Sequence, residues 1–255
     1  MKIAIIQPDI IWENKDLNFE KYETIFQKIF TENSGVDLIV LPEFFSFGFS
    51  MNVSLAETEE GESLSFLKQN ANKYRCAIIG SIPIMENEKI YNRAYFVTEE
   101  FIRYYDKKHL FSYGGEDSFF KAGTSQTIVD YLDLKIKIQI CYDLRFPVWS
   151  RIVENNYDVL INISCWPSSR ISVTEPLTKA RAIENQSYAI FVNRTGNEPS
   201  NSYNGNSIAV DFKGNTIFKL GSEESYSVLT IDKDKLTHFR EKFPVWKDAD
   251  KFYFE

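Results

Sequence analysis

The sequence predicts an α/β fold in which helices lie outside and sheets lie inside. Short β-branched runs alternate with segments of helical spacing along much of the chain. The pattern also recurs, because one helical segment precedes DLIVLPE at residues 37–43 and another precedes DVLINIS at residues 158–164. No linker divides the 255 residues. We therefore expect two similar βαβ-like halves packed as a single domain over residues 1–255.

The first half contains two predicted helices among several predicted strands. Leu17, Tyr22 and Phe26 recur at roughly helical spacing and predict a helix over residues 14–32. A more polar helix is expected over residues 62–74. The β-branched and apolar runs predict strands over residues 2–7, 37–43, 76–84, 91–98 and 101–105.

The second half repeats this order. Residues 135–140 alternate with period two, which is typical of a half-buried strand, and lead directly into Cys141. Pro147 suits the first turn of a helix that we expect to continue to Asn155. Thr174 is expected to cap a later helix. Further strands are predicted over residues 158–163, 187–193, 207–211, 216–220 and 227–231, before an aromatic tail.

Composition and charge narrow the classes of function. The net charge of −7 argues against general binding of nucleic acid or of an anionic membrane, since both would be repelled. No apolar run approaches the length of a membrane span, and no signal peptide is visible. Three widely spaced cysteines predict no disulfide framework. These features favour a cytoplasmic enzyme with reduced thiols.

Several conventional kinds of site are missing from the sequence. The chain has only two histidines, and no cluster has the spacing of a zinc site. It lacks the Gly-x-Ser-x-Gly motif of serine hydrolases, and it lacks both glycine-rich phosphate-binding motifs. We therefore expect an enzyme without metal or cofactor.

Cys141 is the candidate nucleophile because it lies between a strand and a helix. A sharp turn there would lift the side chain out of the sheet and aim backbone N–H groups at it, which favours a thiolate and a developing oxyanion. Glu43 ends the matching strand of the first half, and Lys107 follows another strand. Taken singly, each could be a surface charge. Together they could form a buried set, in which burial raises the pKa of Glu43 and the ammonium lowers that of Cys141.

Three segments resemble the signature segments of the nitrilase superfamily of carbon–nitrogen hydrolases, in the same order. They are Leu41–Glu43, Tyr105–Phe111 and Cys141–Pro147, and the similarity extends to Arg181–Gln186 and Lys242–Trp246. The omega-amidase branch is the most similar. This resemblance implies an α-β-β-α sandwich of the nitrilase type that usually forms a homodimer. The C-terminal tail, about residues 240–255, is then expected at the dimer interface.

The resemblance also implies roles for individual residues. Glu43 would be the general base, Lys107 would stabilise the oxyanion and Cys141 would be the nucleophile. The backbone N–H of Tyr142 would be the second oxyanion donor. Glu116 matches a further glutamate found in many members, which would position Lys107 or the substrate amide; otherwise it is a loop carboxylate.

Arg145 is the candidate ligand for a substrate carboxylate, because a planar, permanently charged guanidinium suits a carboxylate. Its alternative role is an ion pair with an aspartate such as Asp143. Phe45 and Trp166 are expected to wall the pocket or to lie in the core. Cys165 is interpreted as a buried or pocket-lining thiol, and Cys76 as a core residue.

The predicted reaction is hydrolysis of a small-molecule amide through a Cys141 thioester. The omega-amidase resemblance implies 2-oxoglutaramate or 2-oxosuccinamate as substrate. Within the superfamily, the alternatives are hydrolysis of an N-carbamoyl amine, a nitrile or deaminated glutathione. Outside it, they are a cysteine–histidine enzyme that uses His109 and a non-catalytic thiol sensor or scaffold.

Overall fold

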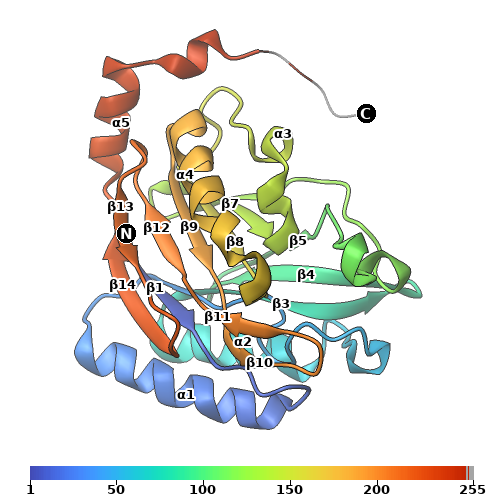
Figure 1. Cartoon of the computed structure of the whole chain (residues 1–255). Coiled ribbons are helices and arrows are strands. Elements are labelled where there is room, and N and C mark those ends of the chain that lie inside the picture. Colours follow the sequence, from blue (N-terminus) through green and yellow to red (C-terminus); the bar gives the residue numbers. More distant parts are fainter. Residues whose placement is uncertain (251, 253–255) are drawn as a thin grey trace.

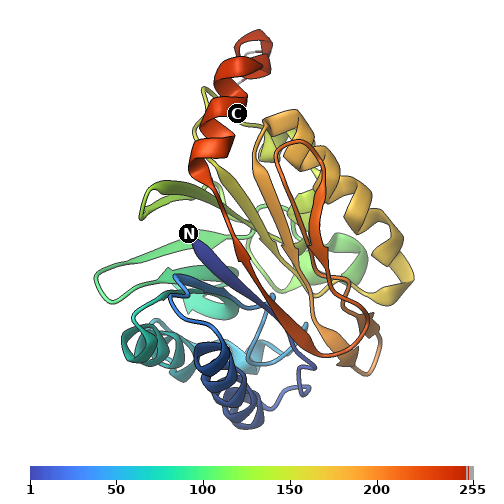
Figure 2. The same ribbon diagram turned by 90° about the vertical axis from the view of Figure 1, so that its left-hand side faces the viewer.

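The computed structural model describes residues 1–250 and 252 and contains two six-stranded sheets. The C-terminal tail, predicted at a dimer interface over about residues 240–255, therefore lies partly outside the described residues. The first sheet has the order β14-β1-β2-β3-β4-β5, and the second has the order β13-β12-β9-β8-β7-β6. Figure 2 shows α1 and α2 on one outer side of the stacked sheets and α4 on the other. The α-β-β-α sandwich predicted from the sequence is thereby confirmed.

The first sheet is built from the N-terminal half and the last strand. Its central strands β1, β2 and β3 are parallel, and α1 and α2 connect them (Figure 1). The elements are β1 (Lys2–Gln7), α1 (Lys15–Glu32), β2 (Leu38–Val40), α2 (Glu62–Tyr74), β3 (Ala77–Glu86), β4 (Lys89–Val97), β5 (Ile102–Asp106) and β14 (Ser225–Thr230).

The second sheet repeats the same plan. Its central strands β7, β8 and β9 are parallel, and α3 and α4 lie between them in the chain. The elements are β6 (Ile128–Tyr131), β7 (Leu134–Ile140), α3 (Pro147–Ser150), β8 (Val159–Ile163), α4 (Thr174–Asn185), β9 (Tyr188–Val192), β12 (Ile208–Val210) and β13 (Thr216–Lys219). The recurrence of the sequence pattern therefore corresponds to two equivalent sheets.

Alternation along the strands of the first sheet separates two hydrophobic layers. Ile5 and Val40 face the second sheet, whereas Ile6 and Ile39 face α1 and α2. Successive residues of a strand point to opposite faces, so a fully buried sheet needs apolar residues at both phases. This requirement explains the continuous apolar runs of the central strands.

Helix α1 differs in one detail from its prediction. Asn14 caps it by accepting the Leu17 N–H at 3.2 Å, but the Leu17 side chain is 44% exposed. Asn18 lies on the buried face instead, where it bonds the backbone of Ile11 and Ser46. The helical period was therefore predicted correctly, while the first position of its buried stripe was wrong.

The second half contains further differences. Helix α3 ends at Ser150 rather than Asn155, and Thr174 is the first residue of α4 rather than its cap, since its hydroxyl donates to the Ile171 carbonyl. Four helices or strands were not predicted: strand β6, helix α5 (Lys233–Lys242), and strands β10 (Thr195–Asn197) and β11 (Ser202–Asn204), which form a hairpin. The three strands among them have only three or four residues, too few for a clear period.

Lys137 is fully buried on β7, which is unusual for a lysine. Its ammonium donates to Gln126 Oε1 at 2.9 Å and lies 5.3 Å from the centre of the Tyr157 ring. Burial lowers the pKa of Lys137 to about 7, although the charge of Asp143 partly opposes this effect. In the unfolded chain the pKa returns to about 10.4. Between these two values the unfolded state binds more protons, so stability rises with pH.

We therefore expect Lys137→Met to stabilise the protein at pH 6 by about 2 kcal/mol, once the lost bond to Gln126 is allowed for. The gain should shrink as the pH approaches 10, because the lysine is then neutral in the folded state and nears its pKa of about 10.4 in the unfolded state. Urea unfolding at both pH values measures this difference. Lys135→Met is the matched control, since Lys135 is exposed on the same strand. Equal effects of the two substitutions on stability would contradict the conclusion that burial of the Lys137 charge destabilises the protein.

Candidate active site

Glu43, Lys107 and Cys141 lie where strands of both sheets end. Glu43 follows β2, Lys107 comes directly after β5, and Cys141 comes directly after β7. Strands β2 and β5 run in the same direction, so both reach the same edge of the first sheet. Carboxyl ends of such strands commonly form ligand sites. Glu43 and Lys107 are 0% exposed, and Cys141 is 8% exposed.

The Lys107 ammonium lies between two buried carboxylates. It donates to Glu43 Oε1 at 2.8 Å and to the two carboxylate oxygens of Glu116 at 2.8 and 3.0 Å. Burial alone would lower the pKa of Lys107, but the charges of Glu116 and Glu43 outweigh it and raise that pKa well above its ordinary value. Lys107 is therefore a permanent cation at neutral pH. The alternative interpretation of Glu116, as a solvated loop carboxylate, is excluded by its full burial.

Asn92, on β4, joins the two carboxylates and was missed in the sequence. Its side-chain amide donates to Glu43 Oε1 at 2.8 Å and to Glu116 Oε1 at 3.0 Å. The backbone completes the set, since the N–H of Cys165 donates to Glu43 Oε2 at 2.8 Å and that of Phe111 donates to Glu116 Oε2 at 2.7 Å. A buried Asn within a strand was the only available signal, and it does not identify its partners.

Cys141 has a left-handed backbone with φ of 45°. Such a conformation costs a non-glycine residue on the order of 1 kcal/mol and is concentrated at functional sites. The turn that follows is the short helix η4 (Cys141–Arg145), and it is fixed by Asp143, whose carboxylate accepts the Ile140 N–H at 3.0 Å. The predicted strand-to-helix turn at Cys141 is therefore present.

Burial raises the pKa of the Cys141 thiol well above its usual range. The charge of Glu43 raises it further, while Lys107 opposes these two effects without overcoming them. Lys107 lowers the thiol pKa, as expected, but burial and the charge of Glu43 raise that pKa by more, so the net shift is upward. Two carboxylates share that single ammonium, so little of its charge remains for the thiol. Cys141 needs a base to become a nucleophile.

His109 is turned toward Asp143 and is part of the scaffold of the turn. Its Nδ1 lies 2.8 Å from Asp143 Oδ1, and its ring stacks on Phe146 with a centroid distance of 3.7 Å. The other Asp143 oxygen accepts the Tyr105 hydroxyl at 2.7 Å. Asp143 is thus engaged by His109 and Tyr105, so it is unavailable as the ion-pair partner considered for Arg145.

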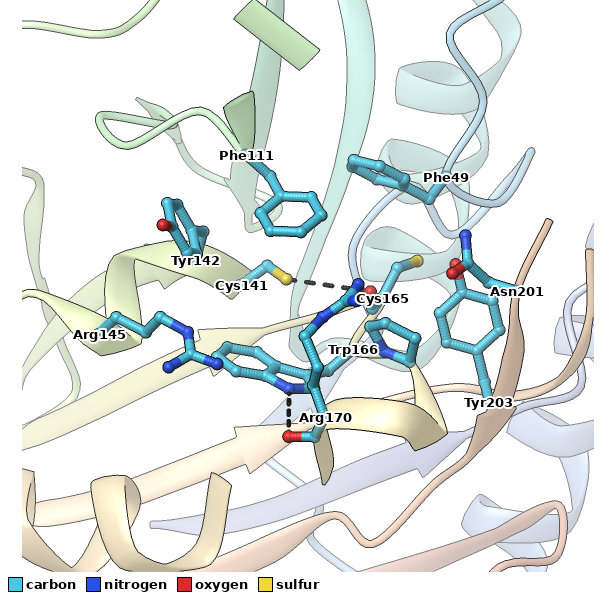
Figure 3. A pocket seen from close by; sticks show the side chains of 11 residues that line it. Phe49, Phe111, Cys141, Tyr142, Arg145, Cys165, Trp166, Arg170, Asn201 and Tyr203 are labelled. Carbon is cyan, nitrogen blue, oxygen red and sulfur yellow. Dashed lines mark hydrogen bonds between the residues drawn. The ribbon is translucent and has the colours of Figure 1, made fainter. Parts of the chain in front are cut away.

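The Cys141 thiol opens into a narrow cavity of about 30 Å³ (Figure 3). Tyr142, Arg145, Cys165 and Trp166 line it, and all four were singled out in the sequence. Residues from loops and edge elements also line it and were not anticipated, because such segments have no periodic pattern: Phe49, Phe111, Pro167, Arg170, Asn201 and Tyr203.

Phe45 does not line this cavity. It is fully buried in the core between the first sheet and its helices, 5.7 Å from the Tyr22 ring and 6.2 Å from the Phe66 ring. Phe44, directly before it, has φ of 45°, which redirects the chain after Glu43. Phe49, four residues further on, is the aromatic residue that this loop contributes to the wall.

Comparison with known proteins identifies the class of this fold and site. The family model described as Carbon-nitrogen hydrolase matches residues 2–241, so the chain belongs to the carbon–nitrogen hydrolase family, that is, to the nitrilase superfamily. Membership makes it a hydrolase of the amidase type.

Its relatives place it more narrowly. The chain is 33% identical to Omega-amidase YafV of Escherichia coli strain K12, with 99% of this chain and 98% of the relative covered. It is also 33% identical to the 2-oxoglutaramate amidase of Bacillus subtilis strain 168, with 98% and 97% covered. The protein thus lies in the omega-amidase branch of the superfamily.

Solved structures of the same superfamily share the fold. A CN-hydrolase superfamily protein from Xanthomonas campestris, with an arsenic adduct in its active site, superposes with a TM-score of 0.95 and 30% identity over 100% of this chain and 99% of that one. Nit3 of Saccharomyces cerevisiae superposes with a TM-score of 0.88 and 26% identity over 96% and 94%.

Residues 1–250 and 252 were searched for metal-binding groups and for membrane-spanning helices. Among them, no group of three or more His, Cys, Asp or Glu side chains is arranged to hold a metal ion. No helix in the same residues is long and apolar enough to cross a membrane.

Because Asn92 bridges Glu43 and Glu116, we expect its replacement to affect catalysis. Asn92→Leu keeps the side-chain size but leaves one oxygen of each carboxylate without its amide donor. We expect kcat for amide hydrolysis to fall by about 10- to 100-fold, since each lost bond to a buried charged group is worth about 1.5–3 kcal/mol, while KM changes little. Steady-state ammonia release measures both constants.

Asn70→Leu is the matched control for this substitution. Asn70 is also buried, but it donates to the Phe66 carbonyl within α2, away from the carboxylates. Its kcat should stay near that of the unaltered protein. Similar kcat values for the two variants would show that Asn92 has no special role in the charged cluster.

Proposed function

We propose that this protein is an omega-amidase that hydrolyses the terminal amide of small 2-oxo acid amides, such as 2-oxoglutaramate and 2-oxosuccinamate, to the 2-oxo acid and ammonia. The observation that carries the proposal is the buried Lys107 ammonium held between Glu43 and Glu116, with Cys141 beside it at the base of the cavity. The names of the Escherichia coli and Bacillus subtilis relatives support the substrate class.

In the first half-reaction, Glu43 acts as the base. The thiol of Cys141 is protonated at neutral pH, so its proton passes to the Glu43 carboxylate as the sulfur bonds to the amide carbon. The carbonyl oxygen becomes an oxyanion, which the Lys107 ammonium and the backbone N–H of Tyr142 stabilise. Glu43 then returns the proton to the amide nitrogen, the carbon–nitrogen bond breaks, and ammonia leaves a thioester on Cys141.

In the second half-reaction, Glu43 takes a proton from water. The resulting hydroxide adds to the thioester carbonyl carbon, and the same two donors stabilise the second oxyanion. The carbon–sulfur bond breaks, the thiol recovers a proton from Glu43, and the acid departs. Glu116 acts throughout by positioning Lys107, which it binds through both oxygens.

Arg145 is proposed to bind the carboxylate at the other end of the substrate. Its guanidinium lies over the Trp166 ring, 5.1 Å from the ring centre, and lines the cavity. A guanidinium presents parallel N–H donors that match a carboxylate. A substrate with a neutral amide at Cys141 and an anionic group at Arg145 is a short acid amide.

We further propose that the protein acts in the cytoplasm as a homodimer. Its three free cysteines are compatible with a reducing compartment. Ile183 on α4 and Phe243 just after α5 are 55% and 59% exposed. The two lie near each other, because Gln186 at the end of α4 donates to the Phe243 carbonyl at 2.7 Å. Large exposed apolar side chains in one region are typical of a subunit interface.

The thioester mechanism predicts that Cys141→Ala lowers the turnover of 2-oxoglutaramate by at least about 10³-fold, because no other step replaces the lost nucleophile. Acid quenching during turnover should leave the acyl group on the peptide that contains Cys141, and mass spectrometry detects it. A panel with an N-carbamoyl amine, a nitrile and deaminated glutathione tests the substrate class.

Cys165→Ala is the control, because Cys165 is a second buried thiol of the same cavity. The acyl group should still form on Cys141 in this variant. Full turnover by Cys141→Ala would refute the mechanism. Faster turnover of another panel member than of 2-oxoglutaramate would refute the substrate class alone.

The proposed dimer predicts that the double variant Ile183→Glu and Phe243→Glu sediments as a monomer, because charges replace apolar contacts in the interface. Sedimentation velocity at micromolar concentration measures the state. Leu17→Glu, an equally drastic change at an exposed site on α1, should remain dimeric. A monomeric unaltered protein would overturn the proposal.

A further inference from the structure

We infer that Arg170 is a second substrate-binding guanidinium, which makes the site prefer a 2-oxo group to an ammonium group beside the substrate carboxylate. This inference rests on the proposed omega-amidase function and deepens it. Arg170 belongs to η5 (Ser168–Val173), the segment between β8 and α4, whereas Arg145 belongs to η4. The two side chains thus reach one cavity from different elements (Figure 3).

Neither guanidinium has a carboxylate partner among residues 1–250 and 252. Arg145 lies over Trp166, and Arg170 lies 5.0 Å from the Phe111 ring centre and 5.9 Å from that of Tyr113. Contact with aromatic faces orients a guanidinium while leaving its N–H groups free. In a chain with net charge −7, two unpaired arginines at one cavity are unusual.

The carboxylates nearest to this cavity are already bound. Glu43 and Glu116 hold the Lys107 ammonium. Glu198, close to the entrance, accepts the Phe49 N–H at 2.8 Å and the Tyr203 hydroxyl at 2.6 Å, and pairs with Arg194. No carboxylate is among the residues that line the cavity itself. A substrate in the inner cavity therefore meets two positive charges, and Glu198, the carboxylate that lines the outer hollow, is already paired with Arg194.

Arg170 is also placed at the entrance of the site. It lines both the inner cavity and an outer hollow of about 410 Å³, which also includes Trp12, Met51 and Tyr113. The amide of a bound substrate must reach Cys141 at the inner end. The carboxylate and the adjoining carbon then lie toward the entrance, between the two guanidinium groups.

With two guanidinium groups beside the substrate carboxylate, the site distinguishes compounds that differ only at the carbon next to that carboxylate. A 2-oxo oxygen accepts a hydrogen bond from a guanidinium, so Arg145 can hold the carboxylate while Arg170 holds the oxo group. An ammonium at the same carbon is repelled by both cations and finds no acceptor carboxylate on the wall. Arg170 thereby favours a 2-oxo acid amide over the corresponding amino acid amide.

Three substrates of one chain length test the inference: 2-oxoglutaramate, glutaramate and L-glutamine. They share the terminal amide and the carboxylate, and they carry an oxo group, two hydrogens or an ammonium group at the second carbon. In Arg170→Met, kcat/KM should fall about 10- to 100-fold for 2-oxoglutaramate, which corresponds to one charged hydrogen bond. It should fall less for glutaramate, and it should not fall for L-glutamine.

Two further variants separate binding from folding and from overall charge. Arg170→Lys retains the positive charge without the planar donor pair, so it should still reject L-glutamine while losing part of the activity on 2-oxoglutaramate. Arg103→Met removes the same charge from the exposed surface of β5 and should leave all three kcat/KM values unchanged.

The readout is the ratio of kcat/KM for 2-oxoglutaramate to that for L-glutamine. A ratio that falls at least about tenfold in Arg170→Met, with glutaramate still hydrolysed, supports the inference. A parallel loss on all three substrates, or an unchanged ratio, overturns it while leaving the omega-amidase proposal intact. An unaltered enzyme that does not hydrolyse 2-oxoglutaramate overturns the proposed function, and the inference with it.

Discussion

The site depends on the sharing of one buried ammonium between two buried carboxylates. Charges removed from water are costly unless partners replace the lost hydration, and removal of one partner leaves the others uncompensated. Here Asn92, the Cys165 N–H and the Phe111 N–H supply the remaining donors to Glu43 and Glu116. Because burial and the charge of Glu43 raise the pKa of the Cys141 thiol more than Lys107 lowers it, Cys141 is left protonated. In the proposed mechanism, the cluster therefore accepts a proton during attack rather than storing a thiolate beforehand.

The repeated sheets explain how residues far apart in the chain form this cluster. Each sheet has three parallel strands at its centre, and the apolar layer between the sheets fixes their relative position. Glu43 and Lys107 come from one sheet and Cys141 comes from the other, so the charged group lies where the two halves meet. Left-handed backbone at Phe44 and Cys141 directs the chain just after Glu43 and at the candidate nucleophile. Such strain persists only where the surrounding packing holds it in place.

The sequence could predict features that depend on neighbouring residues, but not those that depend on contacts between residues far apart in the chain. The helical and strand periods, the recurrence of DLIVLPE and DVLINIS, and the strand-end positions of Glu43 and Cys141 are local patterns, and the structure has each of them. Asn92 bonds Glu43 and Glu116, and Arg170 contacts the Phe111 ring. These partners are far away in the chain, and no local pattern identifies them. Phe45 illustrates the same limit, because the positive φ of the residue before it decides between core and cavity. The net pKa of Cys141 likewise depends on how three distant charges are distributed.

The two ends of the cavity have opposite electrostatic character, and this contrast orients a ligand. At the inner end, a single ammonium is outnumbered by carboxylates, which suits a neutral amide that becomes negative only as it reacts. Toward the entrance, Arg145 and Arg170 present positive charge over aromatic walls. An anionic group placed at the inner end would lie nearer the buried carboxylates of Glu43 and Glu116, which do not line the cavity, whereas at the entrance it meets two cations. Because the protein as a whole is acidic, the proposed binding of an anionic substrate in one direction depends on this local reversal of sign at the entrance.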